Sequence, residues 1–414
     1  MRLVLRVAAG SAALLLLAGC ASLGPTLPMS AADEAPSEEL SFGVRTLGAD
    51  GEFELLSSRE LARRLRSQIG DRPLSMLALS SGGASGAFGA GALAGATRGG
   101  ARPEFTVVTG VSTGALVAPF AFLGPSSDAE MTQIFTTGAT DGLLRHRGFT
   151  ALFGSSVYSG EPLRRLIDRY ADNAMIAAIA VQAARGRLLL VATTDLSSGE
   201  PVVWDLGSIA LHGGKNAKPL IRKVLLASAS VPGMLPPVVV RFRSRGQMRE
   251  ETHVDGGVTL PFFIAPMPQD LPQSTRAGAQ TTVVRVIIDG PLRNLPSPTR
   301  DNAFSVFRRS ISAGLSHMTR TQLEATVEEM RQRGIALDYA AIPVSYPLRG
   351  SFDFSPDGER SLFEYAERCA AAGRLWIGVH AESGAGVSSL LPPTASPMCP
   401  ADDAYFERLA SLWD

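Results

Sequence analysis

The chain has 414 residues, of which 45% are hydrophobic and 19% charged, and its 39 basic and 39 acidic residues cancel. This length and apolar content allow one large globular domain or two ordinary ones, with an ample core. The balanced charge and the lack of a basic cluster argue against a nucleic-acid partner and against a strongly anionic one.

The N-terminus has the parts of an export signal. Arg2 and Arg6 precede an apolar run that reaches Leu17, and small residues follow it up to Cys20. The run is too short to span a membrane comfortably, whereas a charged start, an apolar stretch and a small-residue cleavage site are typical of a secretory signal peptide. We therefore predict that residues 1–19 are a signal peptide.

The sequence L-A-G-C at residues 17–20 resembles a bacterial lipobox, in which the cysteine is acylated and becomes the mature N-terminus. Acyl chains on Cys20 would anchor the protein stably, because each buried methylene contributes about 0.8 kcal/mol. Ala21 is not the aspartate that resembles an inner-membrane retention signal, so we expect an outer-membrane protein that faces the periplasm. The alternative is an ordinary signal peptide with an incidental cysteine.

Residues 20–72 are expected to join this anchor to a folded domain. Pro25, Pro28 and Pro36, with several Ser, Ala and acidic residues, predict a flexible tether to about residue 40. An amphipathic helix is expected at 55–69, where apolar residues are spaced four apart.

Beyond the tether, short apolar strands alternate with helical stretches. Such alternation predicts an α/β fold whose sheet is covered on both faces. The segment 282–288 is nearly all β-branched, as a buried parallel strand should be. The expected strands are 75–79, 105–109, 187–194, 201–206, 238–242, 282–288 and 335–342. The expected helices after the first lie up to about residue 95 and at 115–123, 128–136, 161–170, 173–184, 217–229, 301–333 and 359–373.

The motif G-V-S-T-G at residues 110–114 lies between an expected strand and an expected helix. This is the context of a nucleophile elbow, in which Gly110 and Gly114 permit a tight turn that exposes the hydroxyl of Ser112. The positive end of the following helix points at the same hydroxyl. The motif alone is weak in a chain with 42 glycines, and the alternative is a glycine-rich turn with an idle serine.

A glycine-rich loop, S-S-G-G-A-S-G at residues 80–86, directly follows the first expected strand of the domain. Bare backbone N–H groups in such a loop can converge into an oxyanion hole. The alternative is a phosphate or dinucleotide loop, since glycines also recur at Gly89, Gly91 and Gly95. The G-x-G-x-x-G spacing is absent after the strand, and the candidate acid, Glu104, precedes a strand instead of ending one.

The segment H-V-D-G-G-V at residues 253–258 places Asp255 at the end of a strand, before Gly256 and Gly257. Such a turn can direct the carboxylate inward while the chain turns away. On its own the pattern is equally an ordinary Asp-Gly turn.

Together the glycine loop, the G-x-S-x-G motif and the late D-G-G resemble the patatin-like phospholipase family over about residues 73–373. The segments 191–195, 227–232 and 352–366 also have that family's general form. The resemblance implies a three-layer α/β fold with a central, mostly parallel sheet flanked by helices. We therefore expect an acyl hydrolase domain at 73–375 and a C-terminal tail at 376–414.

The resemblance also implies roles for individual residues. Ser112 would be the nucleophile and Asp255 its partner, in a dyad without histidine. Backbone groups of the glycine loop and the elbow would form the oxyanion hole. The residues assigned to that hole are Gly82, Gly83, Ala84 and Thr113. The sequence departs from the family pattern at Ser81, where a glycine is usual, and at Ser85, where an Arg or Lys is usual.

A conventional Ser-Asp-His triad remains an alternative, because His317 and His380 follow Asp255 in the chain. His317 falls inside an expected helix, and His380 lies near the tail. His253 is expected on the same side of its strand as Asp255, where it could tune the charge of that residue. We expect no metal site, since no cluster has ligand spacing, and no cofactor.

The sequence thus predicts a lipid-anchored serine acyl hydrolase that cleaves carboxylic esters of membrane lipids, either phospholipids or lysophospholipids. The alternative function is a non-catalytic envelope lipoprotein that binds lipid or scaffolds a complex. Cys369 and Cys399 could pair in an oxidising periplasm, or both could stay unpaired. The sequence leaves the oligomeric state open.

Overall fold

The computed structural model describes residues 43–70, 72–145, 155–268, 271, 282–293, 298–379 and 399–400. The predicted signal peptide, the lipidation site at Cys20 and the tether lie outside the described residues. Most of the expected tail also lies outside them.

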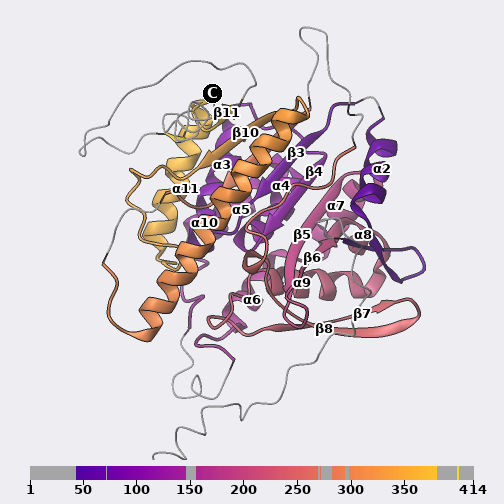
Figure 1. Ribbon diagram of the computed structural model, residues 1–414, viewed down its shortest axis with the longest axis horizontal. Helices are drawn as coiled ribbons and strands as arrows, with labels where there is room; N and C mark the ends of the chain where they lie inside the picture. The colour runs from indigo at the N-terminus through magenta and orange to yellow at the C-terminus, as the bar shows by residue number, and fades with distance from the viewer. Residues whose placement is uncertain are drawn as a thin grey trace, which may run out of the picture.

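The described strands form one sheet of 11 strands (Figure 1). Its main path has the order β11-β10-β9-β3-β4-β5-β6-β1-β2, and β8 pairs with both β5 and β7. The strands β10, β9, β3, β4 and β5 run parallel at its centre, whereas both edges are antiparallel. The bounds are β1 Val44–Leu47, β2 Phe53–Leu56, β3 Ser75–Leu79, β4 Val107–Val111, β5 Leu188–Asp195, β6 Pro201–Asp205, β7 Val238–Ser244, β8 Gln247–Asp255, β9 Val283–Ile288, β10 Ala336–Ala341 and β11 Ile377–Val379.

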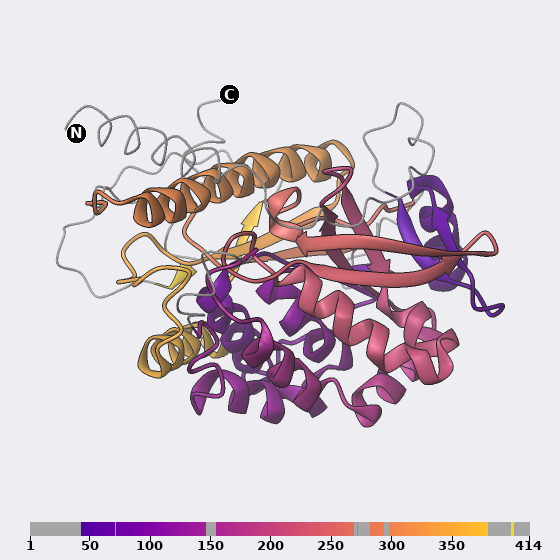
Figure 2. The same cartoon turned by 90° about the horizontal axis from the view of Figure 1, so that it is seen from below.

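Helices cover both faces of this sheet, as Figure 2 shows. Leu77 and Leu79 of β3 face a core shared with α3 to α9 and α11, while Met76 and Ala78 face a second core with α2 and α10. The α-helices are α2 Ser58–Ile69, α3 Gly86–Arg98, α4 Thr113–Leu123, α5 Asp128–Thr136, α6 Glu161–Tyr170, α7 Asn173–Ala184, α8 Leu206–His212, α9 Ala217–Ser228, α10 Ala303–Gln332 and α11 Pro356–Ala371. The predicted fold class, a mostly parallel sheet between helical layers, is confirmed.

The first predicted helix begins three residues later than expected. Residues 53–56 form β2, which pairs with β1 as an antiparallel hairpin, because Phe53 and Leu56 are buried there. Ser57 then caps α2 with its side chain, and Glu60 completes a capping box. The apolar spacing located the helix, but it did not mark where the preceding strand ended.

The small residues of α3 serve close packing. A Cβ on Gly91 would lie 2.1 Å from the carbonyl oxygen of Phe363, and one on Gly95 would lie 2.2 Å from that of Glu367. Both carbonyls belong to α11, so the absence of side chains lets the two helices touch through their backbones. The amide of Gly89 donates to Asp289 Oδ1 at 2.9 Å. These contacts give the glycines a role that requires no bound dinucleotide.

Cys369 and Cys399 form a disulfide, which settles the pairing that the sequence left open. Cys369 lies buried in α11, and the bridge joins residues separated by 30 positions in the chain. The bridge therefore ties Cys399, within the expected C-terminal tail, to α11.

Candidate active site

Ser112 lies in a tight turn between β4 and α4, as the motif predicts. Its φ of 56° is in the left-handed region, which non-glycine residues adopt rarely and at a cost. The turn is held because the Ser112 N–H donates to Ser228 Oγ at 3.0 Å, and Ser228 Oγ donates in turn to the carbonyl oxygen of Ala192 at 2.7 Å. A Cβ on Gly114 would lie 2.5 Å from the carbonyl oxygens of Leu79 and Ser80, so this position requires glycine.

Asp255 reaches Ser112 because two strands use the same edge of β5. Val111, the last residue of β4, is paired with Ala192, and the next position of β5, Thr193, is paired with Asp255 of β8. The C-terminal ends of β4 and β8 therefore meet head to head. A close turn follows Asp255, since a Cβ on Gly256 would lie 2.4 Å from the Ala192 carbonyl oxygen.

The two side chains form a direct hydrogen bond. Ser112 Oγ donates to Asp255 Oδ2 at 2.6 Å, and the Gly257 N–H donates to Asp255 Oδ1 at 2.7 Å. Ser112 and Asp255 are each 4% exposed. Burial raises the pKa of Asp255 to about 7, although the hydrogen bonds from Ser112 and Gly257 oppose the shift. The carboxyl group thus contacts the hydroxyl directly, and its pKa lies near neutral pH.

The glycine loop lies beside the serine. Thr113 Oγ1 donates to the Gly83 carbonyl oxygen at 2.8 Å and ties the elbow to the loop. Within the described residues the N–H groups of Gly83 and Thr113 have no acceptor. The Ala84 N–H differs from the prediction, because it donates to the Ser351 carbonyl oxygen at 2.8 Å.

Gly82 and Gly83 could not carry side chains in this arrangement. A Cβ on Gly82 would lie 2.3 Å from Asp289 Cβ, and one on Gly83, whose φ is +59°, would lie 2.0 Å from the Ser351 carbonyl oxygen. Ser85, at the position where the resemblance expects a cation, is 1% exposed, and its Oγ has no hydrogen-bond partner in the described part of the chain. The hollow next to Ser85 is also lined by Arg349.

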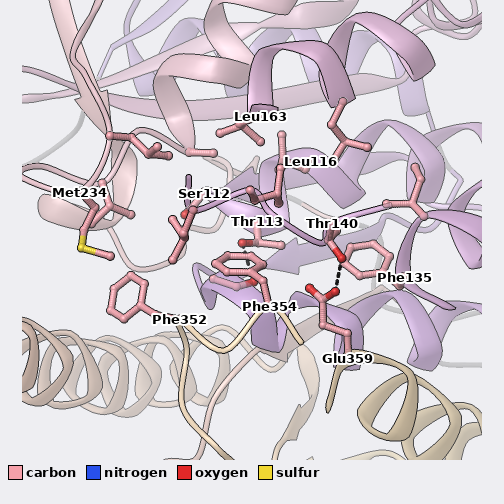
Figure 3. Close-up of a pocket in the computed structure, with 18 of the residues that line it drawn as sticks. Ser112, Thr113, Leu116, Phe135, Thr140, Leu163, Met234, Phe352, Phe354 and Glu359 are labelled. Atoms are coloured by element: carbon pink, nitrogen blue, oxygen red, sulfur yellow. Dashed lines mark hydrogen bonds between the residues drawn. The ribbon is translucent and has the colours of Figure 1, made fainter. Parts of the chain in front are cut away.

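A mostly apolar cavity opens beside Ser112 and Gly83 (Figure 3). Its empty space, with adjoining open solvent included, is roughly 790 Å³. Its apolar lining comes mainly from α4, α5, α6 and the segments around Met234 and Phe352, and includes Leu116, Phe120, Phe135, Leu163, Leu166, Met234, Leu235, Phe352 and Phe354. Such a lining suits a hydrocarbon chain better than a polar substrate.

None of the histidines that the structure describes contacts the serine or the aspartate. His253 is fully buried, but its ring is hydrogen-bonded to Thr193 Oγ1 and Glu251 Oε2, both at 3.0 Å, so it does not tune Asp255 through contact. His317 is an exposed residue of α10 whose ring is bonded to Arg320. His380 lies outside the described residues.

Among the described residues, no group of three or more His, Cys, Asp or Glu side chains could hold a metal ion. The helices described here include none that is both long and apolar enough to cross a membrane. Phe120, Phe122, Phe262 and Phe263 are buried in the two cores and do not form an exposed apolar surface.

Sequence reasoning missed several residues of the site. Ser228 and Ser351 hold the elbow and the glycine loop, and Thr140 and Glu359 place polar groups in the cavity. Ser228 falls within the segment 227–232, which has the family's general form, but no local pattern in the sequence indicates its partner.

Comparison with known proteins shows what part of this chain is similar to. Residues 77–266 match the family model of the patatin-like phospholipases, a class of lipid acyl hydrolases. The resemblance to this family that the sequence predicts is therefore confirmed over these residues. Among solved structures it resembles VipD from Legionella pneumophila, at 10% identity over 84% of this chain and 73% of that chain. The TM-score is 0.32, which is too low to support an argument. None of the curated proteins matches the chain.

Proposed function

We propose that the protein is a serine acyl hydrolase that cleaves carboxylic esters of membrane lipids through a dyad of Ser112 and Asp255. The observation that carries the proposal is the 2.6 Å hydrogen bond from Ser112 Oγ to Asp255 Oδ2, with Ser112 lining an apolar cavity. A buried carboxyl group whose pKa is near 7 can both accept and return a proton at neutral pH.

In the first half of the reaction, Ser112 Oγ attacks the ester carbonyl carbon and Asp255 Oδ2 takes the hydroxyl proton. The C=O π electron pair moves to the carbonyl oxygen, which becomes an oxyanion. The N–H groups of Gly83 and Thr113 would bind this oxyanion, and their lack of an acceptor among the described residues supports that role. When the intermediate collapses, the ester C–O bond breaks and the proton on Asp255 passes to the leaving alcohol. The acyl group then remains on Ser112.

In the second half, Asp255 takes a proton from water while the water oxygen attacks the acyl carbon. The proton returns to Ser112 Oγ as the free fatty acid leaves. The strained φ of Ser112 and its short contact with Asp255 support this use of one carboxylate as both base and acid.

The apolar cavity supports the proposal that the substrate is a lipid ester, either a phospholipid or a lysophospholipid. An acyl chain would occupy the apolar lining, while the alcohol portion would leave past the glycine loop. Burying each methylene of the chain contributes about 0.8 kcal/mol to binding. A short-chain ester should therefore bind more weakly than a long-chain one.

We further propose that the protein is exported, acylated on Cys20 and held at the outer membrane facing the periplasm. The lipobox-like segment supports the anchor, and the disulfide between Cys369 and Cys399 fits an oxidising compartment. The anchor would keep the cavity near its lipid substrate.

The test is ester hydrolysis by the full chain in mixed micelles, with lysophospholipid and a nitrophenyl ester as substrates. Ser112→Ala should abolish turnover, and Asp255→Asn should lower kcat by about 10³-fold or more, since it removes the base. His317→Ala/His380→Ala is the matched control, because a conventional triad would need one of these two histidines and the dyad needs neither.

A fluorophosphonate probe adds a readout that is independent of the substrate. It should label wild type and His317→Ala/His380→Ala, but not Ser112→Ala. A folded wild type that neither reacts with the probe nor hydrolyses either ester would refute the proposed activity. An Asp255→Asn variant that retains more than about a tenth of the wild-type rate would refute the dyad.

A further inference from the structure

Beyond Ser112 and Thr113, the side chains of Thr140, Tyr170 and Glu359 place polar groups in the apolar lining of the cavity. Figure 3 shows Thr140 and Glu359 together, beyond Thr113 as seen from Ser112. Thr140 is 3% exposed and Glu359 is 2% exposed, so both are shielded from bulk water. Thr140 Oγ1 donates a hydrogen bond to Glu359 Oε2.

The other carboxyl oxygen, Glu359 Oε1, has no hydrogen-bond partner in the described part of the chain. Burial raises the pKa of Glu359 to about 7, and the nearby charges of Asp353 and Asp141 act in the same direction. The carboxyl group is therefore neutral at a pH below that value and can donate as well as accept. A buried polar atom without a partner costs about 1–3 kcal/mol.

Tyr170 shows the same feature. It lines the same cavity, is 3% exposed, and its hydroxyl has no hydrogen-bond partner among the described residues. If the cavity held only an unsubstituted hydrocarbon, Leu and Phe in place of Glu359 and Tyr170 would be more favourable, because no polar group would be buried without a partner. Two unpartnered polar groups in one apolar cavity indicate that its occupant carries a polar atom of its own.

We propose that Glu359, with Thr140, is a specificity-determining site for acyl chains that carry a hydrogen-bonding oxygen, most simply a hydroxyl group, away from the ester. The inference rests on the proposed function, because it takes the cavity as the acyl site. The hydroxyl would donate to or accept from Glu359 Oε1, while Thr140 holds the other carboxyl oxygen in place. A plain chain would leave Oε1 without a partner.

A single buried hydrogen bond of this kind should favour the hydroxylated chain about tenfold in affinity. Binding is measured with the full chain carrying Ser112→Ala, so that no ester is consumed. The probes are the methyl ester of a saturated fatty acid and the methyl esters of its hydroxy counterparts, of equal length. These carry the hydroxyl near the carboxyl end or in mid-chain, and each competes with a fluorescent fatty acid.

At least one hydroxy ester should bind about tenfold more tightly than the plain ester. The double variant Thr140→Val/Glu359→Leu, which replaces both partners with apolar groups, should lose this preference or reverse it. Glu359→Gln keeps a hydrogen-bonding group in place and should retain part of the preference.

The matched control is another buried threonine and acid pair. Thr46 Oγ1 donates to Asp205 Oδ2 at 3.3 Å, and neither residue lines the cavity. Thr46→Val/Asp205→Asn should keep the preference for the hydroxy ester even if it lowers the stability of the protein.

Equal affinity of the Ser112→Ala chain for the plain ester and for every hydroxy ester overturns the proposal, and means that water alone satisfies Glu359. A preference that survives in Thr140→Val/Glu359→Leu also overturns it. Neither result depends on turnover. Absence of hydrolysis by wild type would refute the proposed function, while the binding preference would still be decided by these measurements.

Discussion

Asp255 joins two properties that usually oppose each other. It is buried deeply enough to raise its pKa to about 7, yet it retains two hydrogen-bond donors that favour the ionised form. The Gly257 N–H fixes one oxygen and leaves the other for Ser112. A carboxylate held in this way can act as a base without a histidine between it and the serine.

This environment predicts the pH dependence of the reaction. A protonated Asp255 cannot accept the Ser112 proton, so kcat/KM should fall about tenfold per pH unit below its pKa of about 7 and level off above it. The profile is measured with a neutral nitrophenyl ester. The same fall of kcat/KM should appear in Glu359→Gln. This result would assign the fall to Asp255 and not to Glu359, whose pKa is also about 7. A flat profile across this range would contradict the role of Asp255.

Single residues were predictable where a local motif fixes their conformation. Ser112 and Asp255 each stand in a turn whose glycines are visible in the sequence, and the structure brings the two together. Ser228 supports the elbow from 116 positions away, and Glu359 meets Thr140 across 219 positions. A long-range partner leaves no local pattern, so the sequence could not reveal these contacts.

At the scale of elements, the sequence located those that are uniformly apolar. The strand β9 and the unit of β4 and α4 lie close to their expected positions. Most of β8 was not predicted, because its first four residues are exposed or half-buried and its buried residues from Glu251 onward are mostly polar. Yet β8 is the element that delivers Asp255, since it continues the edge of β5 beyond the end of β4.

The packing of α3 against α11 can be tested with glycine. Gly95→Ala should lower the free energy of unfolding by about 1–3 kcal/mol, because the new Cβ would lie 2.2 Å from the Glu367 carbonyl oxygen. Gly314→Ala is the matched control in α10, where a Cβ would meet nothing within 4 Å. It should stabilise the protein by about 0.5–1 kcal/mol. Urea unfolding gives both values, and changes of the same sign would argue against the backbone contact.

At the scale of the molecule, the disulfide joins the tail to the helical layer. Cys369→Ser should lower the free energy of unfolding by about 3.5 kcal/mol, because the open chain regains the entropy that a closed loop of this size removes. The measurement is urea unfolding of wild type and Cys369→Ser under non-reducing conditions. A reducing agent should destabilise wild type by a similar amount and leave Cys369→Ser unchanged. No effect of either change would show that the bridge does not form in solution.

The last prediction concerns how the whole protein meets its substrate. If Cys20 carries the acyl chains, Cys20→Ala should lose palmitate labelling and leave the membrane fraction, because two or more chains are needed for a stable anchor. Cys369→Ser is the matched cysteine control and should remain labelled. Turnover of a soluble nitrophenyl ester should stay unchanged in Cys20→Ala, since the described site lies within residues 43–379. Turnover of lipids in the membrane to which wild type is anchored should fall. Continued membrane fractionation of unlabelled Cys20→Ala would show that another segment holds the protein at the membrane.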